Sequence, residues 1–262
     1  MSCDRCVNRA DLRKSGVPDS QKKAIGAGGA SRLQCEECGR FVTSAGVCVN
    51  PQCQAAFDSA IQALQVGGSD ERVYAVDTLR DIGGEDAEAA LIQAFASDED
   101  WSVRWGAIDA LGDMGGDRAA MELSRLLGEE QDCEIRQRCA TSLGNIGGQW
   151  AVSGLVDVAH QDPDWDVREE AKAQLARIAQ HDKDSEVRVL AVDALVRFPD
   201  SAEAVDALAK ALGNDESFDV RWSAAEALGD IGGEDAEAAL IQALREEQDC
   251  EIRQHCVQML GG

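Results

Sequence analysis

The sequence predicts an all-α solenoid of paired helices, preceded by a small cysteine-rich module. The first observation is an arginine that recurs at intervals of 32, 32, 32, 20, 33 and 32 residues, at Arg72, Arg104, Arg136, Arg168, Arg188, Arg221 and Arg253. The second is a helical spacing of apolar residues after each arginine, and the third is a glycine pair that follows several of these segments. A repeat of this length is typical of stacked two-helix units.

The arginine-bearing segment, for example DWSVRWGAIDALGDMGG at residues 100–116, predicts the first helix of each unit. Four residues before the arginine stands a side chain that suits a helix N-cap: Asp100, Asp132, Asp164, Asp184, Ser217 or Asp249. One apolar stripe follows along the helix: Val103, Ala107, Ala110, Leu111 and Met114. The glycine pairs then end the helix, because glycine tolerates a left-handed C-terminal residue.

A second helix, rich in Ala and Leu, is predicted after each of these ends. Its apolar residues keep a helical spacing in two clear examples: Ala87, Ala90, Leu91 and Ala94, and Ala236, Ala239, Leu240 and Ala243. Neither helix of a pair can bury its apolar stripe alone. We therefore expect about six to seven helical units to stack over residues 55–262.

The interval of 20 residues between Arg168 and Arg188 is the one large irregularity of the repeat. It leaves room for one helix and a turn rather than for a helix pair. Ala179-Gln180 also stands where other units have Gly-Gly. We expect one helix to be missing here and the superhelix to have an irregular joint near residues 180–184.

The pattern D-x-x-[VI]-R-x-x-A-x-x-A-L-G-x-[IM]-G resembles the HEAT-like repeat associated with phycobilisome lyases, over roughly residues 55–262. The resemblance implies that the arginine and the aspartate tie adjacent units together. It also implies that the arginine-bearing helices line the concave face. The same resemblance raises one alternative function, the handling of an open-chain tetrapyrrole on a phycobiliprotein.

The acidity of the chain belongs to the repeats. The whole sequence has 49 acidic and 25 basic side chains, but residues 1–58 have 6 and 8, so their net charge is +2 while that of residues 59–262 is −26. Such a surface excludes the repeats as a nucleic-acid interface, because affinity for nucleic acid comes from cations that meet phosphates. The acidity either attracts a basic partner or adapts the protein to a high-salt habitat. We favour a halophilic source because Lys is scarce, with 6 against 19 Arg.

Six of the ten cysteines lie in the first 53 residues, and the segment CEECGRFVTSAGVCVNPQC resembles a zinc ribbon. Four thiolates at these spacings can converge on one tetrahedral Zn²⁺, and such a closed site is structural. The preferred ligands are Cys35, Cys38, Cys48 and Cys53, in a module of residues 1–54. Two alternatives stay open: Cys3 and Cys6 join Cys35 and Cys38 in the site, or they form a second site completed by another chain.

The other four cysteines occupy matching places in two repeats, in the pattern C-E-I-R-Q-x-C. Cys139 and Cys256 stand where other units have Ala, so we expect small core residues. Cys133 and Cys250 stand near a predicted helix N-terminus, where a thiol can be reactive. We favour their partial burial beside aromatic side chains.

Two aromatic pairs are the candidate partner-binding residues. Trp101 with Trp105, and Phe218 with Trp222, are spaced i, i+4 on arginine-bearing helices, in a chain with only 11 aromatic residues. They could pack one repeat against the next. They could equally anchor a partner helix or peptide, because Trp dominates binding hot spots.

The sequence shows no catalytic constellation. None of the three histidines is followed by Glu, unlike the His-Glu pairs of the iron-binding HEAT hydroxylases, and GAGGAS at residues 26–31 lacks the Lys of a phosphate-binding loop. We predict a non-enzymatic protein-interaction scaffold. Besides tetrapyrrole handling, the alternative is an adaptor that binds nucleic acid or a ribosome through basic side chains of residues 1–54. No apolar stretch is long enough for a membrane span or a signal-peptide core, so we expect a cytoplasmic protein.

Overall fold

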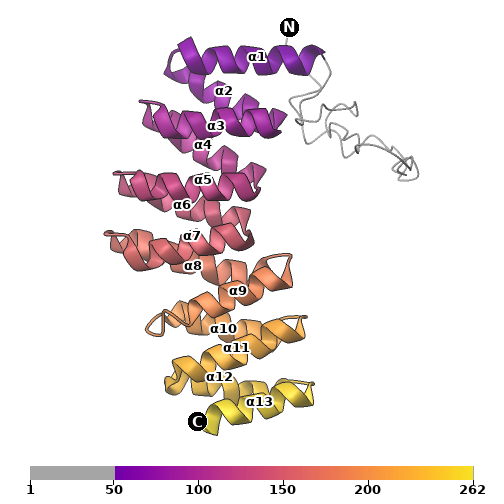
Figure 1. Cartoon of the computed structure of the whole chain (residues 1–262). Helices are drawn as coiled ribbons and strands as arrows, with labels where there is room; N and C mark the ends of the chain where they lie inside the picture. The colour runs from indigo at the N-terminus through magenta and orange to yellow at the C-terminus, as the bar shows by residue number, and fades with distance from the viewer. Residues whose placement is uncertain (1–50, 262) are drawn as a thin grey trace, which may run out of the picture. The chain divides into compact units, whose positions relative to one another are not determined.

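The computed structural model describes residues 51–261 and, for side chains, residues 54–261. Within this range all regular structure is helical (Figure 1). The helices are α1 (Pro51–Val66), α2 (Ser69–Ile82), α3 (Glu85–Ser97), α4 (Trp101–Met114), α5 (Asp117–Glu129), α6 (Cys133–Ile146), α7 (Gly148–Gln161), α8 (Trp165–His181), α9 (Ser185–Leu195), α10 (Ala202–Asn214), α11 (Phe218–Ile231), α12 (Gly233–Glu246) and α13 (Cys250–Gly261). The predicted all-α solenoid is confirmed for this part of the chain.

The chain divides into two compact units, of which the first extends to Ala110 and the second begins at Leu111. In the first unit α1 packs against α2 and α3, and α2 packs against α3. Leu79 of α2 and Leu91 of α3 are fully buried there. Helix α1 begins at Pro51, and the module of residues 1–54 stays a prediction.

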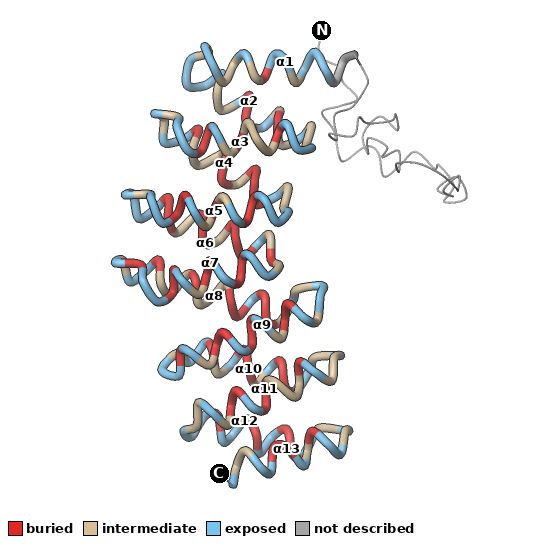
Figure 2. The backbone as a smooth tube through the Cα atoms, in the orientation of Figure 1, coloured by how far each residue is buried: buried red, intermediate tan, exposed pale blue. Residues whose placement is uncertain are grey.

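The second unit consists of two layers of helices. In one layer α5, α7, α9, α11 and α13 pack in that order, and in the other α6, α8, α10 and α12 pack in that order. Leu123, Leu143, Leu155, Leu175 and Leu208 are fully buried, and Figure 2 shows buried segments on helices of both layers. Burial of each such side chain stabilises the fold by about 2 kcal/mol.

The arginine-bearing helices change layers at α9. Arg136 and Arg168 lie on α6 and α8 in one layer, whereas Arg188, Arg221 and Arg253 lie on α9, α11 and α13 in the other. The exchange occurs because α8 is followed directly by another arginine-bearing helix, which takes the place beside α7 that the second helix of a pair would fill. The helices keep alternating between layers. The implied restriction of arginine-bearing helices to one face is therefore wrong for this unit, and a change of twist at residues 180–184 stays a prediction.

The predicted N-caps are mostly confirmed. The Asp132 carboxylate accepts hydrogen bonds from the backbone N–H groups of Glu134 and Ile135 at 2.9 and 3.3 Å, Asp164 caps α8 in the same way, and Asp184 caps α9 with one hydrogen bond. Ser217 was expected to cap α11, but its side chain makes no capping hydrogen bond.

The glycine pairs end helices by a different geometry from the one expected. Gly83 has φ 67° and ψ −172°, and Gly232 has φ 64° and ψ −168°. These values lie outside the left-handed helical region, in a region that only glycine enters without strain. The chain therefore turns sharply into the next helix, and a side chain at either position would destabilise that turn.

Several of the arginines connect their own repeat to the loop after the following helix, which confirms their predicted structural role. Arg136 donates from Nε and a terminal nitrogen to Asp162 at 2.8 and 3.0 Å. Arg188 makes the same two-pronged contact with Asp215 at 2.7 and 2.8 Å, and Arg221 reaches Glu247 at 2.9 Å. The third nitrogen donates to carbonyl groups before its own helix, as Arg136 does to the Gln131 carbonyl at 2.9 Å. One side chain thus fixes two loops at once.

Candidate functional site

The first predicted aromatic pair lies on the first turns of α4 in unit 1. The ring centroids of Trp101 and Trp105 are 4.7 Å apart, with the ring planes inclined by 39°. Trp101 is 43% exposed and Trp105 is half-buried. The pair therefore combines a supported ring with a large open apolar face, which is the geometry that suits a binding anchor.

The second pair lies on α11 in unit 2 and continues into α13. The rings of Phe218 and Trp222 are 5.7 Å apart, and Trp222 stacks on His255 at 3.9 Å with only 7° between the planes. Phe218 and Trp222 are both half-buried. This pair accordingly packs two repeats together and still leaves part of each ring accessible.

His255 has an unusual environment. It is 6% exposed, and neither ring nitrogen has a hydrogen-bond partner within the described chain. A buried polar group without a partner costs about 1–3 kcal/mol. The stacking contact with Trp222 offsets part of this cost. His255 was not among the predicted site residues, although it stands two residues after Arg253, one position beyond that of Trp222 after Arg221.

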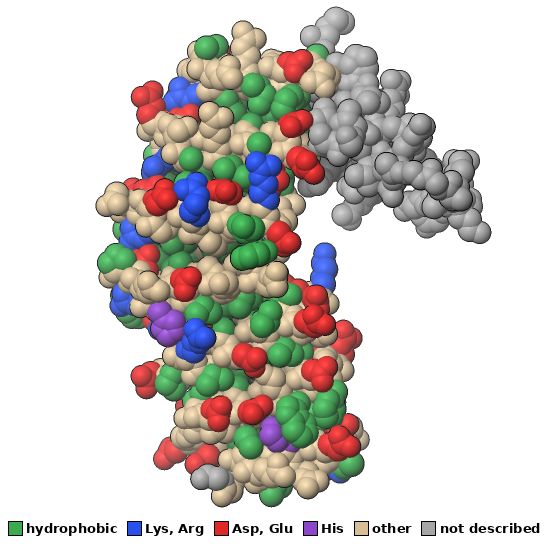
Figure 3. Space-filling model, viewed as in Figure 1, with side chains coloured by type: hydrophobic (Ala, Val, Ile, Leu, Met, Phe, Trp, Pro, Cys, Tyr) green, Lys and Arg blue, Asp and Glu red, His purple; other side chains and the backbone are tan. Residues whose placement is uncertain are grey.

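Leu190 of α9 completes this surface. It is 45% exposed and, like His255, stands two residues after a repeat arginine. Helices α9, α11 and α13 are neighbours in one layer, so these side chains follow one another across the layer. We call Leu190, Phe218, Trp222 and His255 the aromatic stripe. Figure 3 shows hydrophobic side chains and a histidine together over α11 and α13, among acidic side chains.

The cysteines of the repeats divide by exposure. Cys139 and Cys256 are buried as predicted, and burial raises the pKa of the Cys256 thiol above its ordinary value of 9.0. The expected partial burial of Cys133 and Cys250 is wrong, because both are exposed. They begin α6 and α13, and the same repeat position is open in α8 as well, where Trp165 is 62% exposed.

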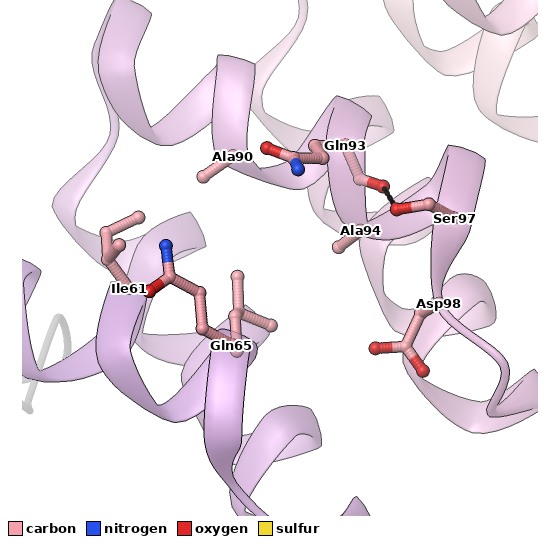
Figure 4. A pocket seen from close by; sticks show the side chains of 8 residues that line it. Ile61, Gln65, Ala90, Gln93, Ala94, Ser97 and Asp98 are labelled. Carbon is pink, nitrogen blue, oxygen red and sulfur yellow. Dashed lines mark hydrogen bonds between the residues drawn. The ribbon is translucent and has the colours of Figure 1, made fainter.

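A pocket of about 210 Å³ lies between α1 and α3 in unit 1 (Figure 4). Ile61 and Gln65 line it from α1, and Ala90, Gln93 and Ala94 line it from α3. This volume is below the range of about 300–1,000 Å³ that is typical of small-molecule sites. The carboxylate at its edge, Asp98, is held by Arg72 at 3.1 Å. The pocket therefore offers neither the space nor the free reactive group of an active site.

The six candidate metal ligands lie outside the described side chains. Cys3, Cys6, Cys35, Cys38 and Cys48 precede the described residues, and of Cys53 only the backbone is described, in the first turn of α1. Within residues 54–261 no group of three His, Cys, Asp or Glu side chains is placed to hold a metal ion. The structure therefore does not test the zinc prediction.

Sequence analysis also missed the acidic partner of the arginine column. Six residues before an arginine stands an acidic side chain: Asp98, Glu130, Asp162, Asp182, Asp215 or Glu247. Its carboxylate accepts a backbone N–H two residues later, as Asp215 does from Ser217 at 2.8 Å, and in several units it also pairs with the arginine of the preceding unit. The constant spacing of this column was a signal that the arginines alone did not reveal.

The family model described as HEAT repeats matches residues 58–138 and 172–261, which is more than half of the chain. The chain therefore belongs to the HEAT-repeat family. A search of curated proteins found no match. No helix in the described range combines the length and the apolar character needed to cross a membrane.

Solved structures of helical-repeat proteins are similar at low identity. Human deoxyhypusine hydroxylase in complex with glycerol is 22% identical, with 80% of this chain and 97% of that chain covered and a TM-score of 0.44. The complex of CpcE and CpcF of phycocyanin lyase from Nostoc sp. PCC7120 is 21% identical, with coverage of 78% and 93% and a TM-score of 0.40. The archaeal HEAT-like repeats protein from Thermococcus onnurineus NA1 is 16% identical, with coverage of 81% and 92% and a TM-score of 0.36.

Proposed function

We propose that this HEAT-repeat protein is a non-enzymatic adaptor that holds a protein partner on aromatic side chains of its arginine-bearing helices. The observation that carries the proposal is the geometry of Trp101, which packs on Trp105 and still exposes 43% of its surface. A ring held in place and partly open provides apolar contact area at little cost in conformational entropy.

The test compares Trp101→Ala with Trp150→Ala, a matched control on α7. Trp150 is 41% exposed, close to the value for Trp101, and belongs to neither aromatic pair. Partners are captured on the full chain from the native host in high salt, identified by mass spectrometry, and purified for titration. Trp101→Ala should weaken binding about thirtyfold or more, as expected for a Trp hot spot, with little change in melting temperature. Trp150→Ala should leave binding unchanged.

Equal effects of the two substitutions on binding would contradict the proposal. A fall in melting temperature that accounts for the lost binding would show that Trp101 is a packing residue instead. Trp222→Ala gives a less direct test, because Trp222 also stacks on His255 and its removal changes the contact between α11 and α13.

We also propose that residues 1–54 form a module stabilised by one structural Zn²⁺, with Cys35, Cys38, Cys48 and Cys53 as ligands. The support is the spacing of two close cysteine pairs. Cys48→Ser in the full chain should lower the bound zinc measured by mass spectrometry, whereas Cys3→Ser should not. The reverse result would replace Cys48 and Cys53 by Cys3 and Cys6 in the site.

A further inference from the structure

Leu190, Trp222 and His255 of the aromatic stripe lie between two rows of carboxylates, and Phe218 lies just outside them, beside Asp219. Two residues before the repeat arginines stand Glu186, Asp219 and Glu251, and five residues after them stand Asp193 and Glu226. All five are exposed. Positions three and four apart share a helix face, so each row lies beside the stripe on its own side.

These carboxylates are largely unneutralised. Asp193 accepts a hydrogen bond from the Ser223 hydroxyl at 2.5 Å, and the other four have no ion-pair partner within the part of the chain that the structure describes. Of the nearby arginines, Arg188 pairs with Asp215 and Arg221 with Glu247, while Arg253 donates to the backbone carbonyls of Glu247 and Gln248. The surface therefore has the apolar side chains of Leu190 and Trp222 at its centre and carboxylates along both sides.

The other layer of the same unit lacks this arrangement. At the positions one and two residues after the arginine, α6 has Gln137 and Arg138, and α8 has Glu169 and Glu170. At these positions α9 has Val189 and Leu190, α11 has Trp222 before Ser223, and α13 has Gln254 before His255, whose ring stacks on Trp222. The combination thus belongs to one layer and does not follow from the overall acidity.

We propose that the aromatic stripe and its acidic rows bind a basic amphipathic helix of a partner protein. This inference deepens the proposed function and rests on it. The two rows are seven residues apart along α9 and α11, or about 10 Å, which matches the width of an α-helix. Neighbouring helices of a layer lie about 8–10 Å apart, so α9, α11 and α13 contact apolar residues of the partner helix about six to seven positions apart.

Charge complementarity selects this occupant. Lys or Arg on both flanks of the partner helix meets the carboxylates of Asp219, Glu226 and Glu251, while its apolar residues cover Leu190 and Trp222. The attraction between the negative rows and a positively charged partner also raises the rate of association. An acidic helix, a nucleic acid or an anionic membrane would be repelled by the same rows.

The test uses the full chain and labelled synthetic helices of about 18 residues, long enough to span the three helices. One peptide carries Leu on one face and Lys on both flanks, and its match carries Glu in place of every Lys. Binding is measured by fluorescence anisotropy at about 0.15 M salt, where screening still allows contacts within about 8 Å. The Lys peptide should bind and the Glu peptide should not.

Two triple variants with equal changes in net charge locate the site. Asp219→Asn, Glu226→Gln and Glu251→Gln together should weaken binding of the Lys peptide about tenfold, as the loss of three exposed ion pairs implies. The control triple Asp166→Asn, Glu203→Gln and Glu237→Gln changes exposed carboxylates of α8, α10 and α12 in the other layer and should change binding less than about twofold.

Leu190→Ser should also weaken binding, because it removes an exposed apolar contact without touching the core. Equal effects of the two charge triples, or equal binding of the Glu peptide, would overturn the inference. If the partner titrations with Trp101→Ala still show a hot spot in that case, the adaptor function stands and only the basic-helix partner fails. If neither the stripe variants nor Trp101→Ala affects binding, both fail.

Discussion

Replacement of Asp162 by Asn should lower the free energy of unfolding by about 3 kcal/mol, because it removes the charge that neutralises a buried guanidinium. Arg136 and Asp162 are each 8% exposed, and two hydrogen bonds of 2.8 and 3.0 Å join them. Asparagine keeps an acceptor for the backbone N–H of Asp164, now bonded at 2.9 Å, so the loss reports mainly on the ion pair.

The assay is urea unfolding followed by circular dichroism and by Trp fluorescence, which must give coincident transitions before a free energy is extracted. Two controls accompany it. Asp206 pairs with Lys210 at 2.6 Å, but the side chains are 61% and 54% exposed, so Asp206→Asn should cost less than about 0.5 kcal/mol. Arg168 donates only to the carbonyls of Asp162 and Pro163, so Arg168→Met should cost about 1 kcal/mol.

Arg136→Met should cost about 3 kcal/mol, well above the value for Arg168→Met. The difference follows from the interval of 20 residues. Asp162, the partner of Arg136, stands 26 positions after it, in the loop that follows α7. The residue 26 positions after Arg168 is Ala194, which lies inside α9 and has no carboxylate. The claim that ion-paired arginines connect adjacent repeats would be refuted by either of two results. One is an equal loss of unfolding free energy for Arg136→Met and Arg168→Met. The other is a loss for Asp162→Asn that is no larger than the loss for Asp206→Asn.

A hydrogen bond from the Ser69 hydroxyl is the largest cause that lowers the pKa of Asp100 below its ordinary value of 3.8, and a hydrogen bond from the Ser102 N–H is the next. The stability that the Asp100 carboxylate contributes is therefore present above pH 3.8 and is lost as the pH falls below it. Ser69→Ala should raise the pKa of Asp100 in an NMR titration, and an unchanged pKa would contradict the assignment. His255→Phe should raise the free energy of unfolding by about 1 kcal/mol in urea, because it removes two unpartnered nitrogens and keeps a ring on Trp222; destabilisation would indicate a hidden partner. Iodoacetamide should modify Cys250 before Cys256 in the native chain, as mapped by mass spectrometry, and the reverse order would contradict their exposures.

The local structure of the repeats could be predicted from the sequence because it depends on residues close in the chain. The cap at Asp132 and the helix end at Gly83 are set by contacts within a few positions. The HEAT assignment rests on the same local periodicity. Ser217 shows the limit of this approach, because a residue with suitable chemistry at the right place makes no capping bond.

The arrangement of the layers could not be predicted in the same way. The interval between Arg168 and Arg188 indicated a missing helix, but the exchange of layers at α9 depends on packing between helices distant in the sequence. The same holds for the candidate site. Periodicity identified Phe218 and Trp222, whereas the stacking of Trp222 on His255 requires α11 and α13 to be neighbours. The zinc ligands proposed for residues 1–54 remain a prediction from spacing alone.

Hydrogen–deuterium exchange of the full chain, with and without the bound Lys peptide, tests the proposed binding surface most directly. We predict slower exchange in peptic fragments of α9, α11 and α13, around Leu190, Trp222 and His255, and no change in α6, α8, α10 and α12. Slower exchange in the second set of helices, or a uniform change along the chain, would contradict the account.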